Sequence, residues 1–145
     1  MSGAPDRPLV VVDTNVVVAG LLTSDSTSPV SRILDGMLAG AFSFVVSEPL
    51  LAEYHAVLVR PKLQVLHGLA LAEVESILTD LALNAMVLNP LTKLAPPAPD
   101  AGDQLLWDLL AARPGLVLVT GDKLLLEDAG MEGRVITLRE FVERT

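Results

Sequence analysis

The sequence contains no cysteine among its 145 residues. This absence excludes disulfide frameworks, thiolate zinc sites and cysteine nucleophiles, and it is compatible with a reducing cytoplasm, where we expect the protein to reside. Aromatic residues make up only 3% of the sequence, although hydrophobic residues make up 51%. The core must therefore consist mainly of Leu, Val and Ala, which favours regular layers of helices and strands.

Long apolar runs are also absent from the sequence. No uninterrupted segment approaches the roughly 18 apolar residues of a membrane-spanning helix, and the apolar stretch 9–22 is broken by the polar residues 13–15. We therefore predict no membrane span and no signal peptide. The length suits one ordinary domain, so we expect a single domain over residues 1–145, with residues 1–7 as a flexible N-terminus.

Basic residues are few, since 10 Lys and Arg stand against 18 Asp and Glu, which gives a formal net charge of −8. This is the wrong sign for a protein that holds nucleic acid through a broad basic face. A substrate that carries phosphate would need a local cation, and clustered carboxylates could bind one. The acidic excess thus indicates either an enzyme with a hard metal ion or a well-solvated surface, and charge alone leaves both open.

Short apolar runs alternate with amphipathic segments along the chain. The runs predict strands at residues 9–12, 42–46, 86–88, 116–119 and 135–136. Helical spacing predicts helices at residues 29–38, 47–60, 72–83, 102–112, 123–128 and 138–143, and the proline-rich residues 90–99 are expected to form a loop. This alternation predicts an α/β fold: repeated βα units in a mostly parallel, twisted sheet of four to five strands, with helices on both faces.

Two aspartates follow predicted strands. Asp13 comes directly after the first strand, and Asp122 comes after the fourth strand by way of Thr120 and Gly121. In open parallel sheets, ligands bind beyond the carboxyl ends of the strands, where the strand order reverses. Both aspartates are therefore expected at the functional edge of the sheet.

Two further acids lie on predicted helices. Glu53 falls at the rim of its helix's apolar face, and Asp103 lies in the first turn of its helix, where the positive helix end tolerates a carboxylate. Asp108 falls on a different face from Asp103, so we do not place it in the same site. Each acid taken alone could be a turn, capping or ion-pair residue, but their joint placement favours one shared site.

Four ordered segments carry these acids: VVVDTNV at residues 10–16, SEPLLAE at 47–53, DAGD at 100–103 and VTGDKLL at 119–125. Together they resemble the motifs of the PIN-domain nucleases, in particular the toxin components of VapBC-like toxin/antitoxin pairs of bacteria and archaea. RPKL at residues 60–63 is similar to the family's usual end of the second-motif helix. The sequence departs from the family pattern at Gly102, Trp107 and Asp108.

The resemblance implies a single PIN-like domain that is a metal-dependent endoribonuclease, leaving a 5′-phosphate and a 3′-hydroxyl. It implies Mg²⁺ or Mn²⁺ as the cofactor, RNA as the substrate, a separately encoded antitoxin as a partner, and a homodimer. It also implies metal-binding catalytic acids and supporting polar residues. The acids are Asp13, Glu53, Asp103 and Asp122, and the supporting residues are Asn15, Ser47 and Thr120.

The chemistry of phosphodiester hydrolysis explains why such a site would be acidic. The substrate is negatively charged and an attacking hydroxide adds charge, which a divalent ion with oxygen ligands can offset. We hypothesise that Asp13 and Asp122 hold the principal ion, and that Glu53 and Asp103 complete its shell or a second one. Thr120 or Asn15 would then orient ligands or the attacking water.

Two other classes of protein remain as alternatives. A phospho-receiver signalling domain would have two adjacent acids after its first strand, whereas here the first strand is followed by Asp13 alone. A catalytically silent interaction module would keep the fold without needing all four acids.

Several other residues carry weaker signals. The lone histidines, His55 and His67, are expected on a surface or along a helix, and Trp107 in the core or against a partner. A base-stacking role for Trp107 stays open. Four basic residues are candidates for guiding phosphate: Arg32, Arg60, Lys62 and Lys123.

Overall fold

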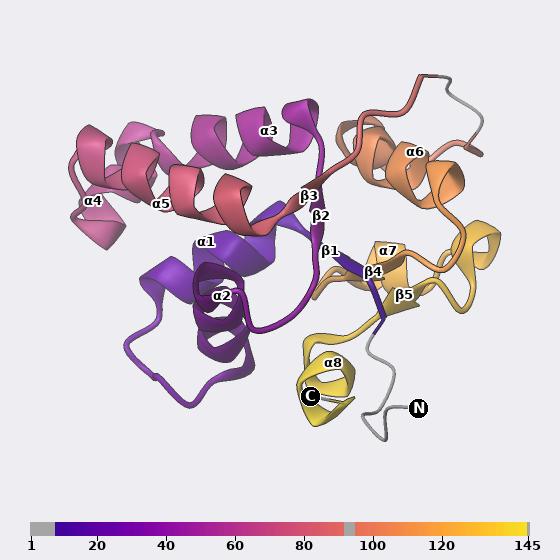
Figure 1. Cartoon of the computed structure of the whole chain (residues 1–145), viewed down its shortest axis with the longest axis horizontal. Coiled ribbons are helices and arrows are strands. Elements are labelled where there is room, and N and C mark those ends of the chain that lie inside the picture. The colour runs from indigo at the N-terminus through magenta and orange to yellow at the C-terminus, as the bar shows by residue number, and fades with distance from the viewer. Residues whose placement is uncertain (1–7, 92–94, 145) are drawn as a thin grey trace.

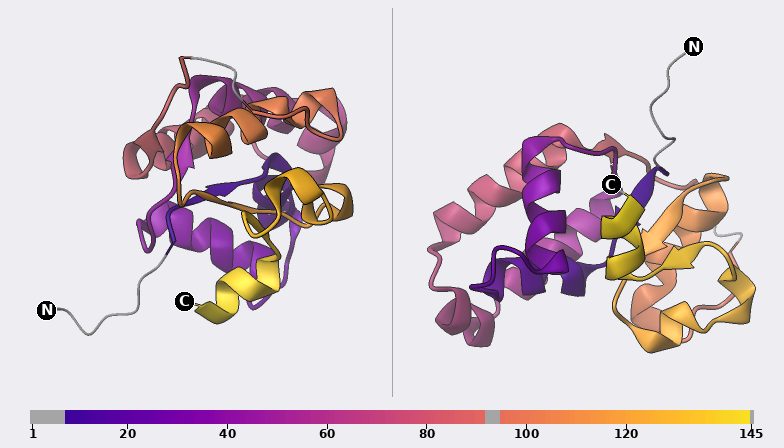
Figure 2. Two further views of the ribbon diagram at one scale, coloured as in Figure 1. Left: turned by 90° about the vertical axis from the view of Figure 1, so that its right-hand side faces the viewer. Right: turned by 90° about the horizontal axis from the view of Figure 1, so that it is seen from below.

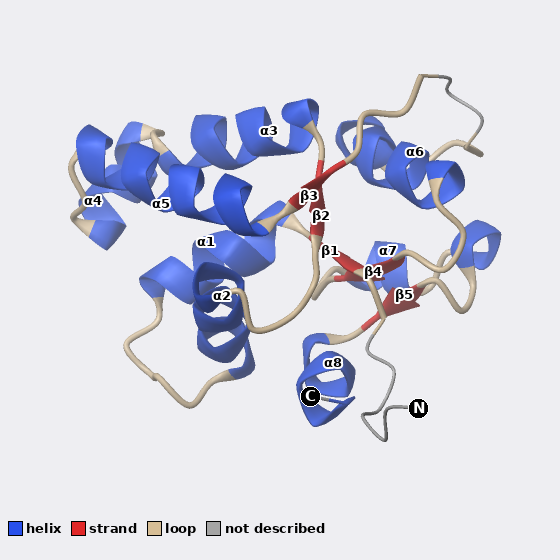
Figure 3. Ribbon diagram, viewed as in Figure 1, coloured by secondary structure: helices blue, strands red, loops and turns tan. Residues whose placement is uncertain are grey.

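The computed structural model describes residues 8–91 and 95–144; the predicted flexible segment 1–7 lies outside the described residues. Figures 1 and 3 show a central group of strands surrounded by helices. Within the described chain the strands are β1 (Val10–Val12), β2 (Val45–Val46), β3 (Met86–Val87), β4 (Val117–Val119) and β5 (Val135–Ile136).

All strand pairings are parallel. β1 pairs with β4 and β4 with β5, while β2 pairs with β3. A single parallel bridge between Val10 and Phe44 joins the two groups, which gives the order β3-β2-β1-β4-β5. The predicted α/β fold with a mostly parallel sheet of four to five strands is confirmed.

Helices lie on both sides of the strands, as predicted. They are α1 (Thr14–Leu22), α2 (Pro29–Ala39), α3 (Glu48–Leu58), α4 (Pro61–His67), α5 (Leu71–Asn84), α6 (Gln104–Ala112), α7 (Lys123–Leu126) and α8 (Leu138–Arg144), with short 3₁₀ turns η1 (Ala101–Asp103) and η2 (Ala129–Met131). In Figure 1 and in the left view of Figure 2, α6 lies on one side of the strands and α8 on the other. Of the helices described, none is long and apolar enough to cross a membrane.

The core is built mainly from aliphatic side chains, as the composition predicts. The three β1 valines are completely buried, which explains why this strand has no polar face. Trp107 is also completely buried, so it is a core residue of α6 and is not placed to stack on a base. Ser28 caps α2, because its hydroxyl accepts a hydrogen bond from the Ser31 N–H at 3.3 Å.

Two helices were not predicted from the sequence. The sequence pattern predicted no helix between the first strand and residue 29, but α1 begins at Thr14. Its sequence, TNVVVAGLL, contains three consecutive valines and a glycine, which are poor helix formers; the burial of Val16 and Val17 stabilises it instead. The second is α4, which begins at Pro61 where only the end of the preceding helix was expected. Proline is favoured at the first position of a helix because its missing N–H would have no helical partner there.

The strand order determines where the functional edge lies. From β1 the chain moves outward to β2 and β3, and it then returns to place β4 and β5 on the other side of β1. The order therefore reverses between β1 and β4, whose last residues, Val12 and Val119, lie side by side in register. Ligands of open parallel sheets bind beyond the carboxyl ends of such a strand pair.

Candidate active site

Asp13 lies at the carboxyl end of β1, at the point where the strand order reverses. Its backbone N–H donates to the Val119 carbonyl of β4 at 3.1 Å, which extends the strand pairing by one bond. The residue is only 4% exposed. The hydroxyl of Thr120, itself fully buried, donates to Asp13 Oδ2 at 2.7 Å. The Asp13 carboxylate is therefore held between the two central strands.

Asp122 is connected to Asp13 through the same hydroxyl. The Asp122 N–H donates to Thr120 Oγ1 at 3.0 Å, while Thr120 in turn donates to Asp13. Asp122 Oδ1 accepts from the Leu124 N–H at 2.9 Å, so this aspartate also caps the short helix α7. Thr120 thus positions both acids, and its role as a supporting residue of a catalytic site stays a prediction.

Glu53 reaches the same region from α3. The hydroxyl of Thr14, the residue directly after Asp13, donates a hydrogen bond to Glu53 Oε2. The next residue of α3, Tyr54, is buried, and its hydroxyl donates to the Val12 carbonyl at the end of β1. These two bonds hold α3 against the end of β1. Glu53 is partly buried, in agreement with its predicted place at the rim of the core.

Thr14 is the site residue that sequence reasoning missed. The sequence shows that Thr14 is adjacent to Asp13, but its hydrogen-bond partner, Glu53, lies 39 residues away in the sequence. Nothing in the local pattern indicates that contact.

Asp103 comes from η1 and is the N-cap residue of α6. Burial raises its pKa to about 6, and the negative charges of Asp13, Asp100, Asp122 and Glu53 contribute to the increase. Asp103 therefore lies within electrostatic range of the other three predicted acids. Asp108, which we excluded from the site, accepts a hydrogen bond from Gln104 at 3.2 Å.

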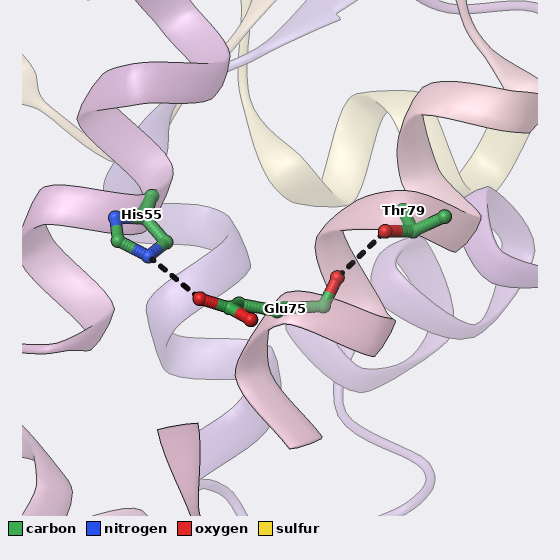
Figure 4. A network of polar contacts seen from close by, with 3 residues as sticks. All are labelled: His55, Glu75 and Thr79. Carbon is green, nitrogen blue, oxygen red and sulfur yellow. Dashed lines mark hydrogen bonds and ion pairs between the residues drawn. The ribbon is translucent and has the colours of Figure 1, made fainter. Parts of the chain in front are cut away.

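Among the residues that the structure describes, no lysine or arginine forms an ion pair with the four acids. The pKa of Asp13 is raised mainly by its burial, and the charges of Glu53 and Asp122 raise it further, against the lowering effect of the Thr120 hydrogen bond. Across residues 8–91 and 95–144 the structure contains one ion pair, between His55 and Glu75 at 4.0 Å. Figure 4 shows this pair together with the hydrogen bond that the Thr79 hydroxyl donates to the Glu75 backbone carbonyl. None of these three residues is a predicted site residue.

The donor atoms fit a hard divalent cation, because they are carboxylate and hydroxyl oxygens, the ligand types that Mg²⁺ and Mn²⁺ prefer. The uncompensated negative charge of the group also calls for a cation. In the part of the chain that the structure describes, however, no three His, Cys, Asp or Glu side chains are close enough together to form a ready-made metal site. The structure thus brings the four acids to one edge of the sheet without arranging them around one ion.

The two remaining supporting candidates differ in environment. Asn15 is exposed in the first turn of α1, and it lines a hollow of about 310 Å³ together with Asp122. Ser47 is buried, and its hydroxyl accepts from the Leu50 N–H at 3.1 Å. The visible role of Ser47 is therefore to cap α3.

Neither histidine contributes to the acidic group, as expected: His55 pairs with Glu75, and His67 Nε2 lies 2.9 Å from the Leu58 carbonyl. The basic candidates are all exposed, and they are Arg32, Arg60, Lys62 and Lys123. Of these four, only Lys123 is adjacent in sequence to a predicted acid, Asp122. A role in guiding phosphate remains a prediction.

The fold and the site define an α/β protein whose acids meet where the order of a parallel sheet reverses. A family model described as "PIN domain" matches residues 9–124, which include all four acids. The chain therefore belongs to the PIN domain family, whose members are generally nucleases. A solved structure of the T. brucei RRP44 PIN domain is similar at 16% identity and a TM-score of 0.48, over 96% of this chain and 81% of that chain. No curated protein matches the sequence.

Proposed function

We propose that this chain is a divalent-metal-dependent endoribonuclease that hydrolyses RNA phosphodiester bonds. One observation carries the proposal: four carboxylates, from four separate segments of a PIN domain, lie within electrostatic range of one another, and among the described residues none of them forms an ion pair with a basic side chain. Burial and neighbouring negative charges raise the pKa of Asp13 and Asp103, and carboxylates with such shifts are typical of catalytic sites. The proposed metal-binding and catalytic acids are Asp13, Glu53, Asp103 and Asp122.

The chain's own residues would position the acids and the substrate. Asp13 and Asp122, which Thr120 links, are the proposed main ligands, and Glu53 and Asp103 would complete the set. A bound Mg²⁺ or Mn²⁺ would supply Lewis acidity toward the phosphate and a lowered pKa for a bound water. The Thr120 hydroxyl already makes two hydrogen bonds, whereas Asn15 is exposed. Of these two candidates, Asn15 is thus better placed to contact water or substrate.

The alternatives are less well supported. The observed strand order, β3-β2-β1-β4-β5, differs from the 2-1-3-4-5 order of phospho-receiver domains, so nothing favours that class. A silent interaction module would not need four acids whose mutual repulsion destabilises the fold. The interaction-module hypothesis predicts a protein that cleaves no RNA with any divalent metal. The cleavage assay therefore distinguishes this hypothesis from the ribonuclease proposal.

A toxin role is part of the proposal, and it rests on the resemblance of the sequence motifs. On this proposal the protein acts on RNA in the cytoplasm, a separately encoded antitoxin inhibits it, and two copies form a homodimer. Induced expression would then arrest bacterial growth, and Asp13→Asn would relieve the arrest. Arrest that is equally strong with the variant would contradict a toxin role that depends on the acids.

The test of the enzymatic proposal is cleavage of total cellular RNA by the purified protein with Mg²⁺, followed by mapping of the ends. We expect 5′-phosphate and 3′-hydroxyl ends, loss of activity with chelator, and a loss of at least 100-fold in Asp13→Asn. Asp35→Asn, a change of an exposed acid on α2, is the matched control and should retain full activity. Undiminished cleavage by folded Asp13→Asn would refute the proposal.

A further inference from the structure

A hollow of about 310 Å³ lies beside Asp122, one of the four acids. It lies between α1, α2, α8 and the connection that follows β4. Its lining residues are Asn15, Val16, Ala19, Val30, Gly121, Asp122 and Leu138. The proposed function gives this space no role.

We propose that the hollow receives one nucleobase of a single-stranded RNA whose phosphodiester group lies at the acids. This inference rests on the proposed ribonuclease activity and extends it to the recognition of the substrate. Asp122 belongs both to the acidic group and to the wall of the hollow. A phosphate at the acids therefore has a covalently attached base within one nucleotide of the space.

The lining matches a base better than it matches the other parts of a nucleotide. Among the described residues that line the hollow, four side chains are aliphatic, none is a lysine or arginine, and the single charge is the carboxylate of Asp122. A phosphate group or an acidic peptide would be repelled, whereas a neutral, flat and largely apolar ring would remove apolar surface from water. The volume falls in the range of small-ligand pockets, which are mostly apolar with a few polar groups.

Asn15 supplies the polar contact that such a site needs. Its side chain is exposed and makes no hydrogen bond to any residue in the ranges 8–91 and 95–144. An asparagine amide offers both a donor and an acceptor, and it can therefore pair with the edge of a base. A base can enter only after it leaves its stack, so the preferred RNA is a single strand, a loop or a bulge.

The experiment uses a short single-stranded RNA with one mapped cleavage site. A series of derivatives carries one abasic ribose at each position around that site, and kcat/KM is measured with the full-length protein and Mg²⁺. We expect one position at which removal of the base lowers kcat/KM by about tenfold or more, the usual scale of a base contact.

Ala19→Leu, which would fill the hollow from α1, links the effect to this place. It should lower kcat/KM for the intact RNA by a similar factor and should leave the RNA that is abasic at the sensitive position unchanged. Ala72→Leu makes the same change at an exposed position of α5 and should affect neither substrate. Asn15→Ala, a change on the surface, provides a second variant that leaves the core intact, and it should weaken the preference between bases at the sensitive position.

Three results would overturn the inference. If no abasic position lowers cleavage, the base proposal fails while the ribonuclease proposal stands. If Ala19→Leu and Asn15→Ala both cleave every substrate like the native protein, the hollow is free for another occupant, such as a segment of a partner protein. If the native protein cleaves no RNA with any divalent metal, both proposals fall together.

Discussion

The charged side chains at the two ends of the central strands differ in the partners that surround them. At the amino ends, the guanidinium of Arg134 donates to three backbone carbonyls, those of Leu110 (2.6 Å), Arg113 (2.9 Å) and Leu116 (2.9 and 3.0 Å). At the carboxyl ends, Asp13 is buried with a hydroxyl and backbone groups around it and with other acids nearby. Within the described residues, the charged group at the amino ends is hydrogen-bonded to the fold, whereas the acids at the carboxyl ends have no ion-pair partner.

This difference separates a structural group from a functional one. The guanidinium of Arg134 connects the end of α6 to the starts of β4 and β5, so its hydrogen bonds hold these segments together. The acids repel one another and lose hydration, which opposes folding. A chain that retains such a group gains nothing in stability from it, and function is the simplest reason for its presence. Variants at the two ends should therefore change stability in opposite directions.

The largest effect on stability is expected from Arg134→Met. The variant keeps much of the apolar stem but leaves the carbonyls of Leu110, Arg113 and Leu116 without their shared donor. Hydrogen bonds to charged groups contribute about 1.5–3 kcal/mol each, so we expect a loss of about 3 kcal/mol in the free energy of unfolding, measured with urea. Arg139→Met, at an exposed position of α8, is the control and should stay within about 0.5 kcal/mol of the native value.

The second effect concerns how the acids are held. Thr14→Val keeps the shape of the side chain and removes the hydroxyl that donates to Glu53. Groups that orient metal ligands typically contribute about 10–100-fold to metal affinity. We therefore expect Mn²⁺ to bind about tenfold more weakly, as measured by calorimetry, with Thr14→Ser restoring the affinity. An unchanged affinity in Thr14→Val would show that Glu53 does not depend on this hydroxyl.

The smallest effect is a gain in stability at the acidic end. Because the pKa of Asp103 is raised to about 6 in the folded protein, the folded state loses stability as pH rises from the ordinary value of 3.8 through 6. Asp103→Asn removes this loss. In metal-free protein at pH 7 we expect it to raise the free energy of unfolding by about 1 kcal/mol, well below the full linkage value because water screens a partly exposed group. The gain should shrink toward zero at pH 4, and a destabilised variant at pH 7 would contradict the repulsion argument.

The sequence predicted the sheet better than it predicted the helices around it. The valine-rich apolar runs at β1 and β4 are local signals, and the structure confirms both predicted strands. The helix α1 could not be predicted because its valines favour strands locally, and only burial against the rest of the chain makes it helical. Local pattern and tertiary packing disagree there, and packing decides the outcome.

The acidic site was predictable only in outline. The rule that ligands bind at the carboxyl ends of parallel strands predicted that Asp13 and Asp122 lie together, and the helix positions of Glu53 and Asp103, supported by the motif resemblance, added these two acids. The bond from Thr14 to Glu53 and the shared hydroxyl of Thr120 depend on segments 39 and 107 residues apart. Such contacts follow from the complete fold and leave no trace in local spacing.

Calorimetric titration of the metal-free protein with Mn²⁺ at neutral pH tests the central claim most directly. The account predicts saturable binding that Asp13→Asn removes and that Asp35→Asn, on the exposed face of α2, retains. Equal binding by the native protein and folded Asp13→Asn, or no saturable binding at all, would contradict the claim that the acids at the ends of β1 and β4 form a cation site.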